Sequence, residues 1–188
     1  MDREIWIVTA AADNRRGGLV ATWVSQASID RQRPTVMAGI APNHFTAELI
    51  DASGAFALHL IGQDQDELVW NFAIGSGRDR DKLAGLDTKK GISDSPVLCN
   101  CLAWLDCRVV ARVDVGDRLL YLADVLAGKV CGDGIALTEQ TMLTLANEEQ
   151  KQQLAEGRKR DVTLQQPLAR QWRERIPAMV QPVSSQRT

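Results

Sequence analysis

The sequence predicts a mainly β protein whose strands pair with their neighbours along the chain as an antiparallel barrel. Through the first 130 residues, short apolar runs alternate with turn signals, as they do in β-rich domains. Residues 105–115 alternate apolar and charged side chains with period two, which predicts a long strand with one face in water. Only short helical patterns interrupt the strands, whereas a doubly wound sheet needs a longer helix after each strand.

Six strands are expected, and the last two form a long antiparallel hairpin. Their ranges are 5–10, 19–24, 35–41, 55–61, 105–115 and 119–127. The hairpin turns at Gly116-Asp117. An earlier turn is predicted over residues 15–18, Arg-Arg-Gly-Gly, because glycine is frequent where the chain reverses.

Two short helices and a long loop are expected between the strands. Asn43 is a suitable N-cap for a helix over residues 45–52, and Gly54 is a suitable residue to end it. Asp64, with an acidic capping partner three residues later, predicts the start of a second helix. Residues 75–95 are rich in Gly, Asp, Arg, Lys and Ser and predict an exposed loop, which a compact domain seldom keeps without a use.

The C-terminal part differs from the rest in both pattern and charge. Beyond about residue 138 the pattern is helical, over 139–157 and 164–175, and Pro177 and Pro182 are expected to end it. Residues 1–150 carry a net charge of −7 and residues 151–188 a net charge of +5.

We therefore divide the chain into a barrel domain over residues 1–137 and a helical C-terminal extension over residues 138–188. Two interpretations of this extension stay open. It docks against the acidic body of its own or a partner chain, or it is a solvated helical tail.

Composition excludes several classes of protein. The formal net charge of the 188 residues is −2, without the basic excess of a nucleic-acid binder. No apolar run is long enough for a transmembrane helix, so no membrane partner is expected. The charged start, Met1 to Glu4, lacks the apolar region of a signal peptide, which predicts a cytoplasmic protein.

Metal and hydrolase chemistry are also disfavoured. The four cysteines, at positions 99, 101, 107 and 131, lack zinc-ligand spacing and are expected to be structural thiols. The two histidines, His44 and His59, leave few bases for a catalytic triad, and His59 lies in an apolar strand that suggests a structural role. Nucleotide-binding and hydrolase motifs are missing, so difficult chemistry would need a cofactor.

Small and polar side chains gather in residues 18–28, Gly-Leu-Val-Ala-Thr-Trp-Val-Ser-Gln-Ala-Ser. Such a strand lets a flat ligand approach the backbone, and Ser28 at its end could meet a phosphate. The helix start at residues 43–46 presents free N–H groups, and Arg78, Arg80 and Lys82 could close over the same anion. Each feature also has a plainer interpretation, as a polar strand face or as a cap for its own helix.

Together these features resemble the flavin reductase-like domains, which have the FMN-binding split-barrel fold. The sequence is similar to the flavin reductase domain at the C-terminus of cyanobacterial flavodiiron proteins. The resemblance covers about two thirds of the chain, and its most specific part is residues 18–28. Supporting segments occur in the same order at 35–40, 54–58, 82–85, 95–98, 103–107 and 116–117.

The resemblance implies a six-stranded antiparallel Greek-key split barrel, a homodimer with the flavin near the subunit interface, and non-covalent FMN. A hydride would pass from NADH or NADPH to the flavin, with no essential catalytic side chain and no metal. Residues 22–25 would line the isoalloxazine, and Ser28 with residues 43–46 would hold the ribityl chain and phosphate. Lys82 and Arg78 would add positive charge at the phosphate. The implied cofactor-binding residues are Ala21, Thr22, Trp23, Val24, Ser25, Ser28, Asn43, His44, Thr46, Arg78 and Lys82.

Two departures keep other functions open. Many members have histidine where this chain has Arg118, and many have Pro-Pro where it has Arg31-Gln32. The alternatives to a reductase are an FMN-binding electron-transfer or sensor module without NAD(P)H turnover, and a scaffold that has lost flavin. The sequence distinguishes neither NADH from NADPH nor the electron acceptor, which could be a partner protein.

Overall fold

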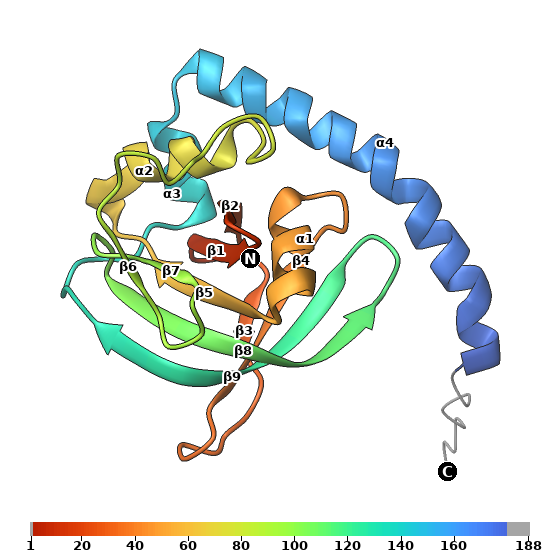
Figure 1. Ribbon diagram of the computed structural model, residues 1–188. Helices are drawn as coiled ribbons and strands as arrows, with labels where there is room; N and C mark the ends of the chain where they lie inside the picture. Colours follow the sequence, from red (N-terminus) through yellow and green to blue (C-terminus); the bar gives the residue numbers. More distant parts are fainter. Residues whose placement is uncertain (1, 180–188) are drawn as a thin grey trace, which may run out of the picture.

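Seven antiparallel strands form one strongly curled sheet in the computed structural model, which describes residues 2–179 (Figure 1). The order of strands across this sheet is β2-β1-β5-β8-β9-β4-β3. Their bounds are β1 Trp6–Ala12, β2 Arg15–Ala21, β3 Val24–Gln26, β4 Thr35–Ile40, β5 Ala55–Leu60, β8 Ala103–Asp114 and β9 Leu119–Val130. A second sheet pairs β6, Thr88–Lys90, with β7, Pro96–Leu98. The mainly β, antiparallel fold class is confirmed.

The two edge strands of the curled sheet, β2 and β3, are consecutive in the chain. Residues 19–24, expected as one strand, are interrupted at Thr22 and Trp23, which carry the chain from one edge to the other. The main sheet therefore has seven strands instead of six.

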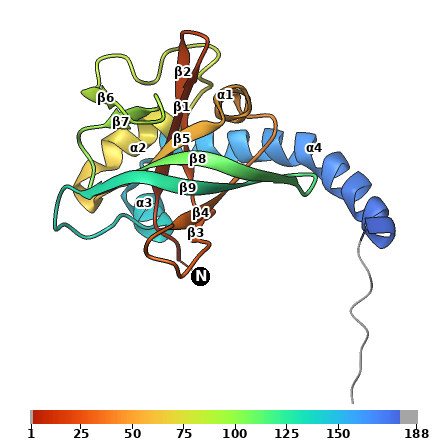
Figure 2. The same ribbon diagram turned by 60° about the horizontal axis from the view of Figure 1, so that its bottom comes forward.

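Four α-helices accompany the sheet in the described residues: α1 Phe45–Ser53, α2 Asp66–Ala73, α3 Glu139–Leu145 and α4 Glu148–Met179. A short 3-10 turn, η1 Gln63–Gln65, precedes α2. Helix α1 lies in the concavity of the sheet, whereas α4 runs round the outside of the molecule (Figures 1 and 2). No helix among residues 2–179 is long and apolar enough to cross a membrane.

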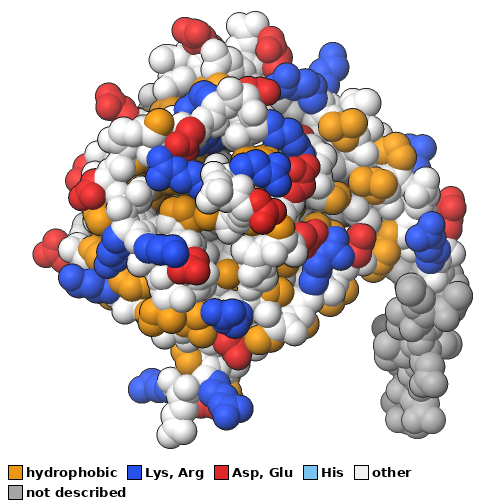
Figure 3. Space-filling model, in the orientation of Figure 1, with side chains coloured by type: hydrophobic (Ala, Val, Ile, Leu, Met, Phe, Trp, Pro, Cys, Tyr) orange, Lys and Arg blue, Asp and Glu red, His pale blue; other side chains and the backbone are white. Residues whose placement is uncertain are grey.

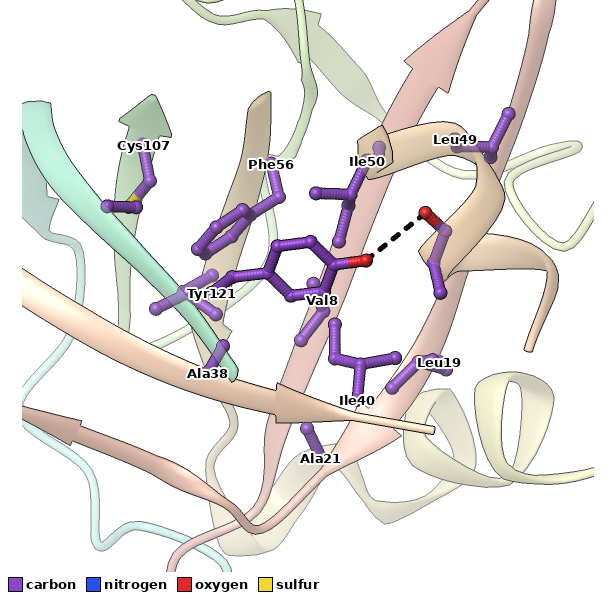
Figure 4. Packing of buried hydrophobic residues seen from close by; sticks show 14 of the residues in the cluster. Val8, Leu19, Ala21, Ala38, Ile40, Leu49, Ile50, Phe56, Cys107 and Tyr121 are labelled. Carbon is purple, nitrogen blue, oxygen red and sulfur yellow. Dashed lines mark hydrogen bonds between the residues drawn. The ribbon is translucent and has the colours of Figure 1, made fainter. Parts of the chain in front are cut away.

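The main core lies between α1 and the concave face of the sheet (Figure 4). Leu49 and Ile50 of α1 are buried against a cluster that includes Phe56 and Tyr121. The Tyr121 hydroxyl lies 2.9 Å from Asp51 Oδ1, so the ring is packed in apolar surroundings while its polar atom reaches α1. Burial, with the Asp51 carboxylate beside it, raises the pKa of Tyr121.

The expected turn at residues 15–18 is wrong. Asp13 and Asn14 make the turn between β1 and β2, with φ of 51° and 59°, a conformation that these two residue types tolerate. Gly17 and Gly18 lie inside β2. A Cβ on Gly18 would stand 2.7 Å from the Phe72 ring and 2.8 Å from the Val8 carbonyl oxygen, so this glycine permits close packing.

The β8–β9 hairpin is confirmed. The prediction that one face of its first strand is exposed to solvent is wrong at Asp106. This carboxylate is fully buried and accepts hydrogen bonds from the backbone N–H (2.9 Å) and the hydroxyl of Ser93. The pairing register shifts between Asp106 and Cys107 and again between Val109 and Ala111. Each irregularity redirects the following side chains, and so strict alternation of faces does not continue along the strand.

The expected pair of C-terminal helices is also wrong. The break falls at Ala146 and Asn147, where the Asn147 side chain accepts from Gln150 N–H at 2.8 Å and the Gln150 side chain accepts from Asn147 N–H at 2.9 Å. This reciprocal cap begins α4, which continues through Pro167 and Pro177. Pro182 lies outside the described residues.

We expect Gly18→Ala to lower the free energy of unfolding by about 1–3 kcal/mol, because the added methyl overpacks the contact with Phe72 and Val8. Gly157→Ala is the matched control, since nothing lies within 4 Å of its added Cβ and it is inside α4. That control should raise stability by about 0.5–1 kcal/mol. Urea denaturation measures both, and equal effects would contradict the packing account.

His59 makes stability depend on pH. Its ring is fully buried, donates from Nδ1 to the Ile7 carbonyl at 3.0 Å and accepts at Nε2 from Leu98 N–H at 3.0 Å, which suits the neutral form. Burial lowers the pKa of His59 from 6.5 to about 4. At pH values between 6.5 and about 4, the unfolded chain therefore binds a proton at His59 that the folded chain does not bind.

Stability should fall as pH drops from 6.5 to about 4, by about 3 kcal/mol from this group. Denaturant titrations at several pH values in His59→Gln and the parent chain isolate the effect. The variant should be less stable at pH 7 and should lose this part of the pH dependence. An unchanged pH profile would refute the assignment.

Candidate functional site

A small hollow of about 110 Å³ lies where the chain crosses between the edges of the curled sheet. Its walls come from the end of β2 with the crossing, from the end of β4, and from single residues before α1 and β9. They are Leu19, Val20, Ala21, Thr22, Trp23, Gly39, Ile40, Ala41, His44 and Arg118.

Trp23 and Arg118 form one side of this hollow. The Trp23 carbonyl accepts from Gly39 N–H at 2.8 Å, and the indole packs so closely on Gly39 that a Cβ there would lie 3.1 Å from the ring. The Arg118 guanidinium stands 4.8 Å above the centre of the Trp23 ring. Trp23 is still 42% exposed. The indole ring and the Arg118 guanidinium therefore border the hollow on the side that faces solvent.

Asn43 and His44 lie between the hollow and α4. His44, and not Asn43 as expected, is the N-cap of α1, which leaves the Asn43 side chain free to bond elsewhere. Asn43 Nδ2 donates to Asp161 Oδ1 at 2.9 Å, and His44 Nε2 lies 3.2 Å from Asp161 Oδ2. Gln165 donates to Asn43 Oδ1 at 3.1 Å and accepts from Arg118 at 2.5 Å.

The structure therefore brings together Ala21, Thr22, Trp23 and His44, with Asn43 beside them. Val24 follows directly as the first residue of β3. Arg78 reaches the same region, because its guanidinium donates to the Asn43 carbonyl at 3.1 Å while it pairs with Glu48.

Other predicted residues bond elsewhere. The Ser25 hydroxyl donates to the neighbouring Gln26 carbonyl at 3.0 Å. Ser28 closes its own loop, donating to the Arg33 carbonyl at 3.1 Å and accepting from Thr35 N–H at 3.2 Å. Thr46 is 2% exposed inside the first turn of α1.

Lys82 is buried, although it belongs to the loop that was expected to be exposed. Its ammonium group donates to the Phe72 carbonyl at 2.6 Å, beneath α2. Burial lowers the pKa of Lys82 to about 8, and the positive charge of Arg80 adds to this effect. Arg80 itself is bonded to the side chain and carbonyl of Asn71.

Sequence reasoning missed Gly39, Asp161 and Gln165. Gly39 lies in a predicted strand, where a glycine marks a close approach and could have been noticed. Asp161 and Gln165 are one helical turn apart, but their partner Asn43 lies 118 and 122 positions earlier in the chain. No local pattern signals such a contact.

A larger open hollow of about 950 Å³ lies near the β1–β2 turn, with Phe45 in its wall. Several of its arginines already have partners, such as Arg16, which pairs with Asp81 at 2.9 Å. Figure 3 shows acidic and basic side chains interspersed on the face that it presents. Recognition of an anion on this face would therefore depend on a few individual hydrogen-bond donors and not on a patch of basic side chains.

Comparison with known proteins identifies the family. The model of the flavin reductase like domain matches residues 1–152, which cover the sheets and the first turns of α4. The chain belongs to this family. The resemblance inferred from residues 18–28 is thereby confirmed.

One relative is diflavin flavoprotein A 1 of Synechocystis, 28% identical over 127 residues. The match covers 67% of this chain but only 22% of that protein, so the chain spans about a fifth of the relative's length. The NADH:FAD oxidoreductase of Streptomyces globisporus C-1027 has a TM-score of 0.67 at 18% identity, covering 73% of this chain and 81% of its own. An FMN-binding protein of Thermus thermophilus has a TM-score of 0.64 at 21% identity, covering 70% and 72%.

The different surroundings of Lys82 and Arg78 give a direct prediction. Lys82→Met should lower the free energy of unfolding by about 1–3 kcal/mol, because the Phe72 carbonyl loses a buried donor. It should leave flavin affinity within about twofold. Isothermal titration measures flavin affinity and urea denaturation measures stability, both for this variant and for Arg78→Ala. A large loss of flavin affinity in a normally stable Lys82→Met variant would contradict the placement of Lys82 beneath α2.

Proposed function

We propose that the chain binds FMN non-covalently at the crossing between β2 and β3 and transfers a hydride to it from NADH or NADPH. The observation that carries this proposal is the hollow beside residues 21–23, with Asn43, His44 and Arg118 at its rim. Membership in the flavin reductase like domain family supports flavin as the ligand. The names of two neighbours, an FMN-binding protein and an NADH:FAD oxidoreductase, agree with this chemistry.

The residues at the site fit the two ends of FMN. The chain leaves the strand ladder at Thr22 and Trp23, so a ring system can approach small side chains and backbone there. The Asn43 amide, the His44 imidazole and the Arg78 guanidinium, which already reaches the Asn43 carbonyl, are suitable donors for one terminal phosphate. Residues of the 21–25 segment would contact the ring, and Asn43, His44 and Arg78 would hold the phosphate.

The hollow itself is smaller than the few hundred cubic ångströms that ligand pockets usually offer. A bound flavin would extend beyond it onto the surface. We propose that a second copy of the chain covers that surface. The exposed apolar residues Val110 and Val113 of β8, which are 56% and 47% exposed, support a homodimer.

In this mechanism the bound flavin supplies the redox chemistry, and the protein supplies position. That chemistry would be acceptance of a hydride, which is two electrons with one proton, from NADH or NADPH. Asn43, His44 and Arg78 would hold the phosphate, and the 21–25 segment would hold the ring. No side-chain acid or base is required, so orientation is the main contribution of the chain.

An FMN-binding electron-transfer or sensor module is the second candidate. Arg118 favours it, because its guanidinium covers one face of Trp23 and is bonded to Gln165. A nicotinamide ring that stacks at this place would have to displace it. The partner would then be an electron-acceptor protein, and NAD(P)H would not be oxidised.

An anaerobic absorbance titration tests the proposal. The chain is loaded with FMN, freed of excess flavin and titrated with NADH or NADPH, and loss of the flavin absorbance band is expected. A bound flavin that stays oxidised would favour the second candidate. Failure to retain any flavin would contradict both.

His44→Ala tests the proposed phosphate contact. We expect FMN affinity to fall by about tenfold, the scale of one hydrogen bond to a charged group, whereas riboflavin affinity changes little. Fluorescence titrations of the two flavins measure this difference. Equal losses for FMN and riboflavin would contradict the assignment.

A further inference from the structure

Helix α4 passes over the rim of the candidate flavin site with one of its faces. The least exposed residues of its middle part recur every three or four positions, which defines a single contact stripe. They are Asp161, Gln165, Ala169 and Trp172. Figure 2 shows the C-terminal end of the helix continuing past the β8–β9 hairpin.

Residues of this stripe form hydrogen bonds with the polar side chains at the rim of the hollow. The two carboxylate oxygens of Asp161 take the Asn43 amide and the His44 ring, and Gln165 joins Asn43 to Arg118. A carboxylate and a phosphate are both oxyanions that accept from the same kinds of donor. Asp161 therefore binds where the proposed function would have the phosphate bind.

The helix is also seated closely on the hairpin turn. A Cβ on Gly116 would lie 2.6 Å from the Leu168 carbonyl oxygen and 2.8 Å from Trp172 Cβ. Gly116 has a φ of 89°, which favours glycine at the turn, and its missing side chain lets the α4 backbone approach. This contact between Gly116 and α4 sets the distance of the helix from the rim of the hollow.

The contact between α4 and the rim is nevertheless mainly polar, and part of it is exposed to solvent. Among the described side chains of α4, Leu154, before this stretch, is the one that packs against a hydrophobic core cluster. The side chains of His44 and Asp161 are 34% and 36% exposed. Polar contacts with such exposure contribute little to stability, so a phosphate can replace the Asp161 carboxylate.

We propose that α4 is a strap whose Asp161 occupies the phosphate position in the flavin-free chain and leaves it when FMN binds. This inference rests on the proposed function, because it requires the phosphate of FMN at Asn43 and His44. Docking of α4 and binding of FMN then exclude one another, since two anions cannot share these donors. Flavin loading is thereby coupled to release of the C-terminal helix.

The flavin affinities of three variants of the 188-residue chain test the competition. Asp161→Ala and Asp161→Asn should bind FMN about tenfold more tightly than the parent chain, and riboflavin should gain less because it has no phosphate. Glu156→Ala is the matched control, since it removes one negative charge from an exposed residue of the same helix whose carboxylate accepts from Gln152, within α4 itself. Equal FMN affinity in Asp161→Ala and Glu156→Ala would overturn the strap.

Hydrogen exchange measures the position of α4 without relying on activity. In the flavin-free parent chain, amides of residues 158–172 should exchange slowly, and saturating FMN or Asp161→Ala should accelerate them. Slow exchange that FMN leaves unchanged would make α4 a fixed wall and overturn the proposal. If no variant binds any flavin, the proposed function fails, whereas FMN binding that is indifferent to Asp161 refutes the strap alone.

Discussion

The whole arrangement depends on the crossing of the chain between the two edges of its sheet. Strand β2 ends at Ala21 and β3 begins at Val24, yet they lie at opposite edges of the seven-stranded order. Two residues can join them only because the sheet curls until its edges approach. The hollow, the exposed Trp23 and the close contact with Gly39 all follow from this constraint.

Patterns that belong to one element were enough to predict most of the fold. The strand at 55–61 and the β8–β9 hairpin follow from apolar runs and turn residues, and Gly54 ends α1 with a φ of 66°. Features that involve two elements were not predictable. Residues 19–24 read as one strand because the break at Thr22 serves the crossing between the two edges of the curled sheet. Asp106 reads as exposed because its cover, Ser93, comes from the loop between β6 and β7, 13 residues earlier in the chain.

The candidate site divides in the same way. Residues 21–23 and His44 were predicted from composition and from the helix start, and the structure brings them to one hollow. Lys82 was expected there because of its charge and its loop, but its ammonium is bonded to Phe72 under α2. Asp161 reaches the rim from a helix in the other half of the chain, in a region that the charge pattern marked as a basic extension, either docked on the acidic body or solvated.

The flavin-site proposal and the α4 proposal meet at Asn43 and His44. A crystal structure of the chain with FMN tests them most directly. The account predicts the isoalloxazine beside residues 21–24, the phosphate on Asn43 and His44, and Asp161 displaced from both. A flavin bound in the open hollow near Arg16, or one bound while Asp161 keeps its contacts with Asn43 and His44, would contradict it.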